Sequence, residues 1–159
     1  MFSVQRIAAV GLVLCALSGC DAHEQQDAFA EEASRPPENI TRVSESGEVL
    51  EVDEDDWRTA PLYRGEILVD PAEPNPVATG GFVAIRVSVT VFNAVQAPLR
   101  VETLRDNRLR TLDVIDQASD PGAYVFSFPA SEIGSRGLHR IFVFDGVGEL
   151  VSYGDVMVE

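Results

Sequence analysis

The sequence predicts an all-β fold, an antiparallel β-sandwich of about seven strands, over residues 57–159. Short runs rich in β-branched and aromatic residues recur there, separated by turn residues, at spacings of about 8–12 residues. Residues 82–92 show the clearest alternation of apolar and polar side chains, which is typical of a strand with one buried face. No segment shows a convincing helical period.

The first expected strand, Leu62 to Val69, ends at the proline-rich residues 70–76, because proline cannot donate a hydrogen bond to a neighbouring strand. The second covers Phe82 to Phe92 and follows a turn at Gly80-Gly81. In this second strand, alternate positions hold apolar residues: Val83, Ile85, Val87, Val89 and Val91. This second strand is expected to bury one face.

Five further strands are expected after residue 92, over residues 99–104, 109–115, 124–128, 138–145 and 150–158. The first two flank Arg105-Asp106-Asn107-Arg108, a turn sequence that suits a hairpin of the longer kind. Residues 129–134 predict a loop or a single helical turn. The last two strands are separated by Gly146 to Glu149.

Residues 137–148 resemble the penultimate strand of bacterial immunoglobulin-like repeats, in which a Gly opens the strand and an Asp with a Gly shortly after closes it. This resemblance implies an immunoglobulin-like or fibronectin-III-like sandwich for residues 57–159. The Cys-Trp-Cys set of antibody domains is absent, and His139 stands where many such domains have a tyrosine. Trp57, at the start of the domain, is expected to cover an open end. An open-edged barrel is the structural alternative.

The N-terminus has the layout of a secretory signal: Arg6, then an apolar run from Ile7 to Leu17 that is too short to span a bilayer. It ends in Leu17-Ser18-Gly19-Cys20, which resembles the lipobox of bacterial lipoprotein precursors. The resemblance implies that residues 1–19 are a signal peptide and that Cys20, lipidated, is the first mature residue. The alternative is an ordinary secretory signal with a Cys near its cleavage site by chance.

The resemblance also bears on localisation in the bacterial cell envelope. Asp21 follows Cys20 directly, and Asp at this place resembles the sorting signal that retains enterobacterial lipoproteins in the inner membrane. The periplasmic face of the inner membrane is therefore favoured over the outer membrane. Cys15 would leave with the signal peptide, so the exported domain has no thiol and must rely on its apolar core.

Residues 20–56 are expected to form a disordered acidic linker. Residues 21–56 carry thirteen acidic side chains against Arg35 and Arg42, a net charge of −11, whereas residues 57–159 have a net charge of −4. Whether residues 40–52 add a short edge strand stays open. The acidic run Asp53 to Asp56 could suggest calcium, but consecutive residues on an extended chain point to opposite sides, so a solvated linker is favoured. No metal or cofactor is expected.

Catalytic residues are not expected. The chain has two histidines, His23 and His139, and no nucleophile-elbow, zinc-protease or phosphate-loop motif. Arg100, Arg105, Arg108 and Arg110 could bind anionic glycans, although a charged hairpin rim is favoured. Four phenylalanines on two expected strands could stack on sugars, although a place in the core is favoured: Phe126, Phe128, Phe142 and Phe144.

Three hypotheses for function remain. The first is a lipid-anchored envelope protein with a non-catalytic module that binds or scaffolds an envelope protein or a glycan. The second is a periplasmic inhibitor or sequestrant of a cationic envelope-targeting protein, suggested by the acidic mature chain. The third and least favoured is an enzyme of unrecognised type. Nucleic acid is not an expected partner, because a chain with pI near 4.4 lacks a basic footprint.

Overall fold

The structure, a computed structural model, describes residues 21–159. The expected signal peptide (residues 1–19) and Cys20 lie outside the described residues. No helix in the described part of the chain is both long and apolar enough to cross a membrane.

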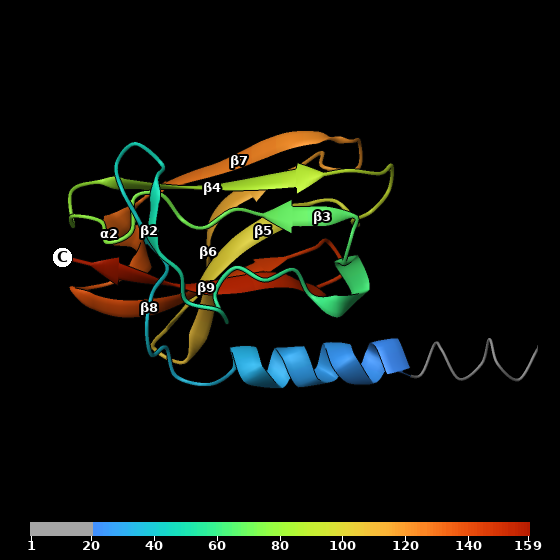
Figure 1. Cartoon of the computed structure of the whole chain (residues 1–159), viewed down its shortest axis with the longest axis horizontal. Helices are drawn as coiled ribbons and strands as arrows, with labels where there is room; N and C mark the ends of the chain where they lie inside the picture. Colours follow the sequence, from blue (N-terminus) through green and yellow to red (C-terminus); the bar gives the residue numbers. More distant parts are fainter. Residues whose placement is uncertain (1–20) are drawn as a thin grey trace, which may run out of the picture.

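Two antiparallel sheets pack face to face around one apolar core (Figure 1). The three-stranded sheet has the order β3-β4-β7, and the four-stranded sheet has the order β6-β5-β8-β9. The bounds are Ile67–Val69 for β3, Phe82–Val89 for β4, Leu99–Arg105 for β5, Arg108–Ile115 for β6, Gly122–Pro129 for β7, Gly137–Phe144 for β8 and Leu150–Val158 for β9. This is the strand order of an immunoglobulin-like sandwich in which the fourth of the seven strands (β6) pairs with the third (β5). The predicted fold class is confirmed.

The core confirms the predicted period of two from Val83 to Val89, but β4 ends at Val89, so the strand expected over residues 82–92 is too long and Val91 is 42 % exposed. On β4 every second side chain, from Val83 to Val89, is at most 3 % exposed. Phe126 and Phe128 of β7 point into the same core. Phe142 and Phe144 of β8 do not, because the inward positions of that strand belong to Ile141 and Val143.

The first expected strand and the expected hairpin turn differ in detail. The segment from Leu62 to Val69 is a strand only over β3, because Pro61 starts a 3₁₀ turn, η1 (Pro61–Tyr63). The β5–β6 hairpin turns over two residues rather than by the longer kind of turn: Asp106 and Asn107 have φ values of 52° and 60°. Asp and Asn tolerate this left-handed conformation, which a tight hairpin turn requires.

The turn between β8 and β9 follows the predicted Asp-Gly pattern. The buried Asp145 accepts hydrogen bonds from the backbone N–H groups of Val147 (3.0 Å) and Glu149 (2.9 Å) and from the hydroxyl of Tyr63 (3.0 Å). Gly146 is needed because a Cβ there would meet the backbone of Ala97. The segment after β7 forms the single helical turn that was expected, α2 (Ala130–Ile133).

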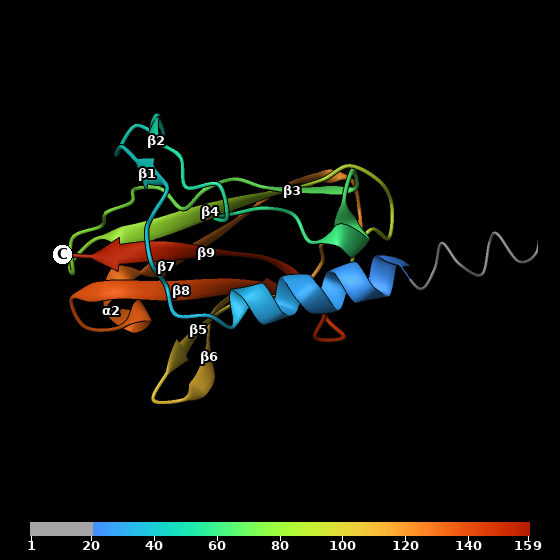
Figure 2. The same ribbon diagram turned by 60° about the horizontal axis from the view of Figure 1, so that its bottom comes forward.

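The expectation of a disordered linker is wrong for residues 21–56. Residues 21–33 are helical, and β1 (Arg42–Val43) pairs with β2 (Val49–Glu51) in a small hairpin of its own (Figure 2). The helix buries Phe29 and Ala33 on the outer face of β8 and β9. The prediction from average composition missed this helix. One apolar stripe is enough to hold a helix against a sheet face, and most of the acidic side chains face solvent.

The outer edge of β9 is closed along its length in the described part of the chain. Backbone hydrogen bonds from residues 57–60 and 77–79 close its two ends. In the middle, the carboxylate of Asp56 accepts the N–H of Asp155 at 2.8 Å, and the amide of Asn75 donates to the carbonyl of Asp155 at 2.8 Å. An edge that is closed in this way is not available to another strand.

Trp57 does not cover an open end of the sandwich. Its backbone N–H donates to the carbonyl of Tyr153 at 2.7 Å, and the residue is 5 % exposed, with its ring against Gly154 of β9. A Cβ at Gly154 would overlap the indole ring.

We therefore predict that Gly154→Ala lowers the free energy of unfolding by about 1–3 kcal/mol, because the ring and the strand must move apart. The measurement is chemical denaturation of the chain, followed by Trp57 fluorescence. Gly80→Ala is the matched control: a Cβ there meets nothing within 4 Å. Equal loss of stability in the two variants would contradict the prediction.

Candidate functional site

The N-terminal helix is held on the sandwich by one arginine of β8. Arg140 lies directly opposite Asp155 of β9 and forms a two-pronged ion pair with it, with both N–O distances 2.7 Å. The third guanidinium nitrogen, Nη1, donates to the carbonyl oxygens of Glu32, Ala33 and Arg35 at 3.0–3.4 Å. Because these carbonyls end the helix, Arg140 satisfies them and places a positive charge at the negative end of the helix dipole.

Other contacts hold the helix along its length. The Nε2 of Gln26 donates to the carbonyl of Leu150 at 2.8 Å, and the ring of Phe29 lies 5.0 Å from the ring of Tyr153. Glu32 forms an ion pair with Arg58 at 2.7 Å. These contacts fix the helix along the outer face of β8 and β9 and leave the face of β5 and β6 uncovered (Figure 2).

The residues after the helix are held by two buried carboxylates. Asp155 accepts the N–H of Glu38 at 3.3 Å, and Asp56 accepts the N–H of Thr41 at 2.7 Å. Asp56 also accepts the N–H of Asp155, so the two carboxylates are close neighbours. Burial, together with the charges of Asp155 and Asp53, raises the pKa of Asp56 from 3.8 to about 7.

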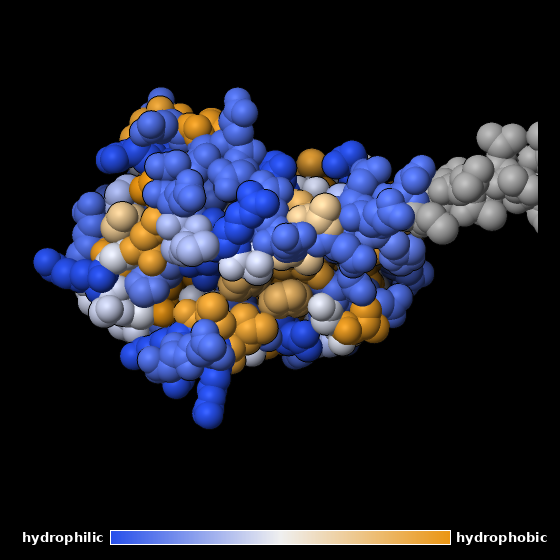
Figure 3. All heavy atoms as spheres, turned by 90° about the horizontal axis from the view of Figure 1, so that it is seen from below, coloured by the Kyte–Doolittle hydropathy of each residue, from blue (hydrophilic) through white to orange (hydrophobic). Residues whose placement is uncertain are grey.

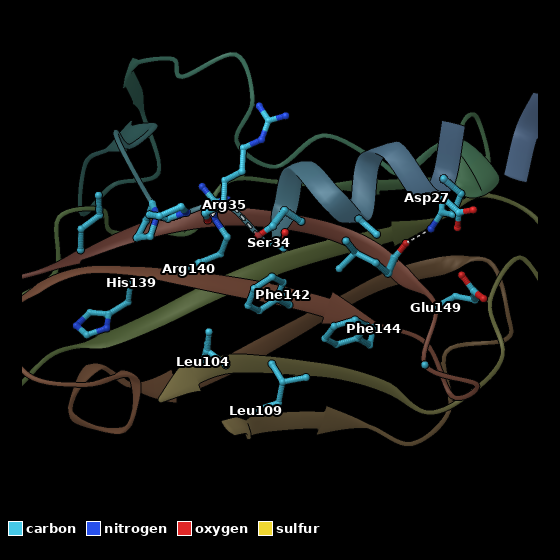
Figure 4. A pocket seen from close by; sticks show the side chains of 18 residues that line it. Asp27, Ser34, Arg35, Leu104, Leu109, His139, Arg140, Phe142, Phe144 and Glu149 are labelled. Carbon is cyan, nitrogen blue, oxygen red and sulfur yellow. Dashed lines mark hydrogen bonds between the residues drawn. The ribbon is translucent and has the colours of Figure 1, made fainter. Parts of the chain in front are cut away.

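An apolar groove of about 640 Å³ lies between this helix and the hairpin of β5 and β6, on the outer face of the four-stranded sheet. Its floor is formed by Phe142 and Phe144, whose rings lie 5.9 Å apart and nearly parallel, and by Leu104 and Leu109, each 51 % exposed. Figure 4 shows these four side chains between the helix and the hairpin, and Figure 3 shows the apolar surface next to the hairpin.

The hairpin beyond the β-bulge in β5 and β6, which we call the arm (residues 102–111), has two different faces. Leu104 and Leu109 lie opposite each other on the groove side. Arg105, Arg108 and Arg110 alternate with them, and none of the three forms an ion pair with another described residue. Arg100 lies apart from this group and pairs with Glu102 at 3.3 Å.

The remaining residues from the sequence analysis lie apart from the groove floor. Asp21 is exposed at the start of the described helix. His139 of β8 lines one end of the groove, with its Nε2 2.6 Å from the carbonyl oxygen of Ser135. Asp56 is buried, unlike the solvated linker that was expected for Asp53 to Asp56. No cluster within residues 21–159 brings together three His, Cys, Asp or Glu side chains that could hold a metal ion.

Compared with known proteins, the chain matches no protein-family model and no curated protein sequence.

Sequence reasoning missed the helix, the buried carboxylates and the groove. The helix had a local signal: Gln26, Phe29 and Ala33 recur at helical spacing on one face. The ion pair of Arg140 with Asp155 had no local signal in the sequence, because the two residues become neighbours only through the register of β8 and β9. The outward position of Phe142 and Phe144 follows from Ile141 and Val143 taking the core side of the same strand.

Arg140→Met tests whether Arg140 holds the N-terminal helix on the sandwich. We predict a loss of about 3–5 kcal/mol in the free energy of unfolding, because Asp155 is left buried without a cation. Hydrogen exchange should show the largest loss of protection in residues 21–41. Arg86→Met is the control, since the ion pairs of Arg86 are half-exposed and its loss should cost less than about 1 kcal/mol. Unchanged protection of the helix in Arg140→Met would contradict this role of Arg140.

Proposed function

We propose that this protein is a lipid-anchored component of the bacterial cell envelope. Its sandwich is a non-catalytic module that binds or scaffolds an envelope protein or a glycan. The anchor is the lipidated Cys20, after removal of residues 1–19, and the membrane face is the periplasmic side of the inner membrane, as Asp21 suggests.

The observation that carries the binding role is the groove. Two leucines that are half-exposed and a pair of stacked phenylalanines form a continuous apolar surface on a sheet face whose other half is already covered by the helix. Exposed apolar surface that gathers in a groove with a polar border is typical of binding sites. Paired aromatic rings and aliphatic side chains suit both the apolar side chains of a protein and the apolar face of a sugar ring.

The fixed helix supports a defined presentation of this groove. Residue 21 directly follows Cys20, and residues 21–33 are clamped to the sandwich rather than forming a long flexible tether. An anchor at Cys20 would then hold the sandwich close to the lipid, in one orientation. A fixed orientation lowers the entropic cost of binding a partner in the same membrane.

The anchor is tested in the bacterial host with metabolic palmitate labelling and membrane sedimentation. We expect the protein to be labelled and to sediment with membranes, and Cys20→Ala to lose both properties, because one thiol carries the lipid. Cys15→Ala is the matched control and should keep both. Labelling of Cys20→Ala at the level of the unmodified protein would refute the anchor.

The groove is tested by placing a photo-crosslinking residue at Leu109 in intact cells. Leu68, 59 % exposed on the three-stranded sheet, is the matched control site. We expect a defined crosslinked product from position 109 and none from position 68. Leu104→Glu should abolish the product from position 109, because binding an apolar partner would bury an unpaired charge in the groove floor. Equal crosslinking at the two sites would contradict a binding role for the groove.

A further inference from the structure

We propose that copies of this protein associate head to tail, with the outer edge of β2 in one copy adding as a strand to the outer edge of β6 in the next. The inference rests on the proposed function, because it names the partner at the arm beside the groove and relies on the anchor to concentrate the copies. Three features of the described residues carry it: two unpaired strand edges, matching side chains and opposite charges.

The first unpaired edge is the outer edge of β6 over residues 108–112. β6 is the last strand of the four-stranded sheet, and no strand or isolated bridge among the described residues pairs with its outer side. The edge of β9, by contrast, is closed along its length, and at the edge of β7 the carboxylate of Asp113 accepts the N–H of Ser127 at 2.8 Å. A row of unpaired N–H and C=O groups is a template for the addition of another strand.

The second unpaired edge is that of β2, in the hairpin of β1 and β2. Its one partner strand in the described part of the chain is β1, whose other side is bridged to Asn75. The apolar side chains of β2 are exposed, Val49 by 48 % and Leu50 by 61 %, and Val52 just beyond the strand is 67 % exposed. Neighbouring apolar side chains on an open strand edge indicate a surface that a partner covers.

The side chains of the two edges match when β2 is placed beside β6. Alternate residues of a strand point to opposite faces, so Leu109 lies on the groove side of the arm, and Arg108 and Arg110 lie on the other side. In β2, Leu50 and Glu51 also point to opposite faces. With Leu50 on the groove side, Glu51 falls on the side of the arginines. One arrangement therefore gives an apolar contact on one face and an ion pair on the other.

The net charges of the two segments are opposite. Residues 100–111 carry four arginines against Glu102 and Asp106, a net charge of +2, within a chain whose overall net charge is −14. Residues 42–54 carry five acidic side chains against Arg42, a net charge of −4. Glu51 lies opposite Arg42 in the hairpin but forms no ion pair with a described residue, as is also true of the three arginines of the arm. The acidic hairpin thus complements the basic arm.

The two edges of one copy cannot meet each other. Figure 2 shows the hairpin of β1 and β2 and the arm of β5 and β6 on opposite sides of the sandwich. The contact therefore joins two different surfaces of two copies, and it repeats into a chain or closes into a ring. Four or five paired residues make an interface smaller than the roughly 1,600 Å² of a standard stable complex, so dissolved copies associate weakly. Anchoring in one membrane raises their effective concentration.

Cysteine crosslinking in intact cells of the bacterial host tests the contact. Two full-length copies with different tags are expressed together, one with Leu109→Cys and the other with Leu50→Cys, and are treated with a short bis-maleimide. Residues 21–159 have no cysteine, and Cys20 is present in every variant, so a pair of otherwise unmodified copies gives the background. We expect a product that carries both tags, because the two positions lie side by side in the contact.

Two control pairs use the same chemistry. Leu68→Cys, at a position 59 % exposed on β3, replaces Leu50→Cys in the first and should give no product above the background. In the second, both copies carry Leu109→Cys, and again no product is expected, because the contact joins different surfaces rather than two copies of one surface.

Charge reversal separates pairing from loss of folding. Glu51→Arg in the Leu50→Cys copy should lower the yield of product at least about fivefold, because like charges then meet across the contact. Arg108→Glu with Arg110→Glu in the Leu109→Cys copy should do the same. When both reversed copies are expressed together, most of the yield should return, which two misfolded proteins would not give.

Absence of the two-tag product, an equal yield from the Leu68→Cys control, or no recovery in the doubly reversed pair would overturn the proposal. A crosslink from position 109 to a different protein or to a glycan, without the two-tag product, would also overturn self-association and would leave the binding role of the groove standing. Palmitate labelling of the same cells measures the anchor separately, so a two-tag product from unlabelled protein would refute the anchor and support the contact between copies.

Discussion

The ion pair between Arg140 and Asp155 is the contact on which the arrangement of the other parts depends. Burying two charges is costly, and the cost is offset only when every donor and acceptor is bonded. Here the guanidinium meets both carboxylate oxygens and three carbonyls at the end of the helix, and its Cζ lies 4.9 Å from the centre of the Tyr153 ring. One cross-strand pair thus joins the sheet to the N-terminal helix.

The same junction makes the acidic N-terminal region part of the folded domain. Asp56 and Asn75 use their side chains as substitutes for a neighbouring strand along β9, and they also bond the backbone of Thr41. The hairpin of β1 and β2 is therefore placed by polar contacts rather than by a core of its own. Polar groups that are buried and fully bonded in this way specify a single arrangement, because any shift leaves several of them unsatisfied.

Much of the sandwich could be predicted because its signals are local. Alternation of apolar side chains from Val83 to Val89, and turn residues such as Asp145 and Gly146, depend on neighbours within a few positions. The strand from Leu150 to Val158 was predicted with the bounds that it has. The region before Trp57 could not be judged in this way, because its helix is stable only against a sheet face that the distant β8 and β9 provide.

The sequence by itself determined the sheet-forming segments, the turns between them, the absence of a thiol from residues 21–159, and an N-terminus that resembles a lipoprotein signal. The tertiary structure decided which faces are buried and which charges meet. Phe142 and Phe144 differ from Phe126 and Phe128 only in the side of the strand on which they fall, and Arg140 finds Asp155 only through strand register. Side-chain periodicity is a property of neighbouring residues, whereas a groove or an ion pair requires distant segments to be brought together.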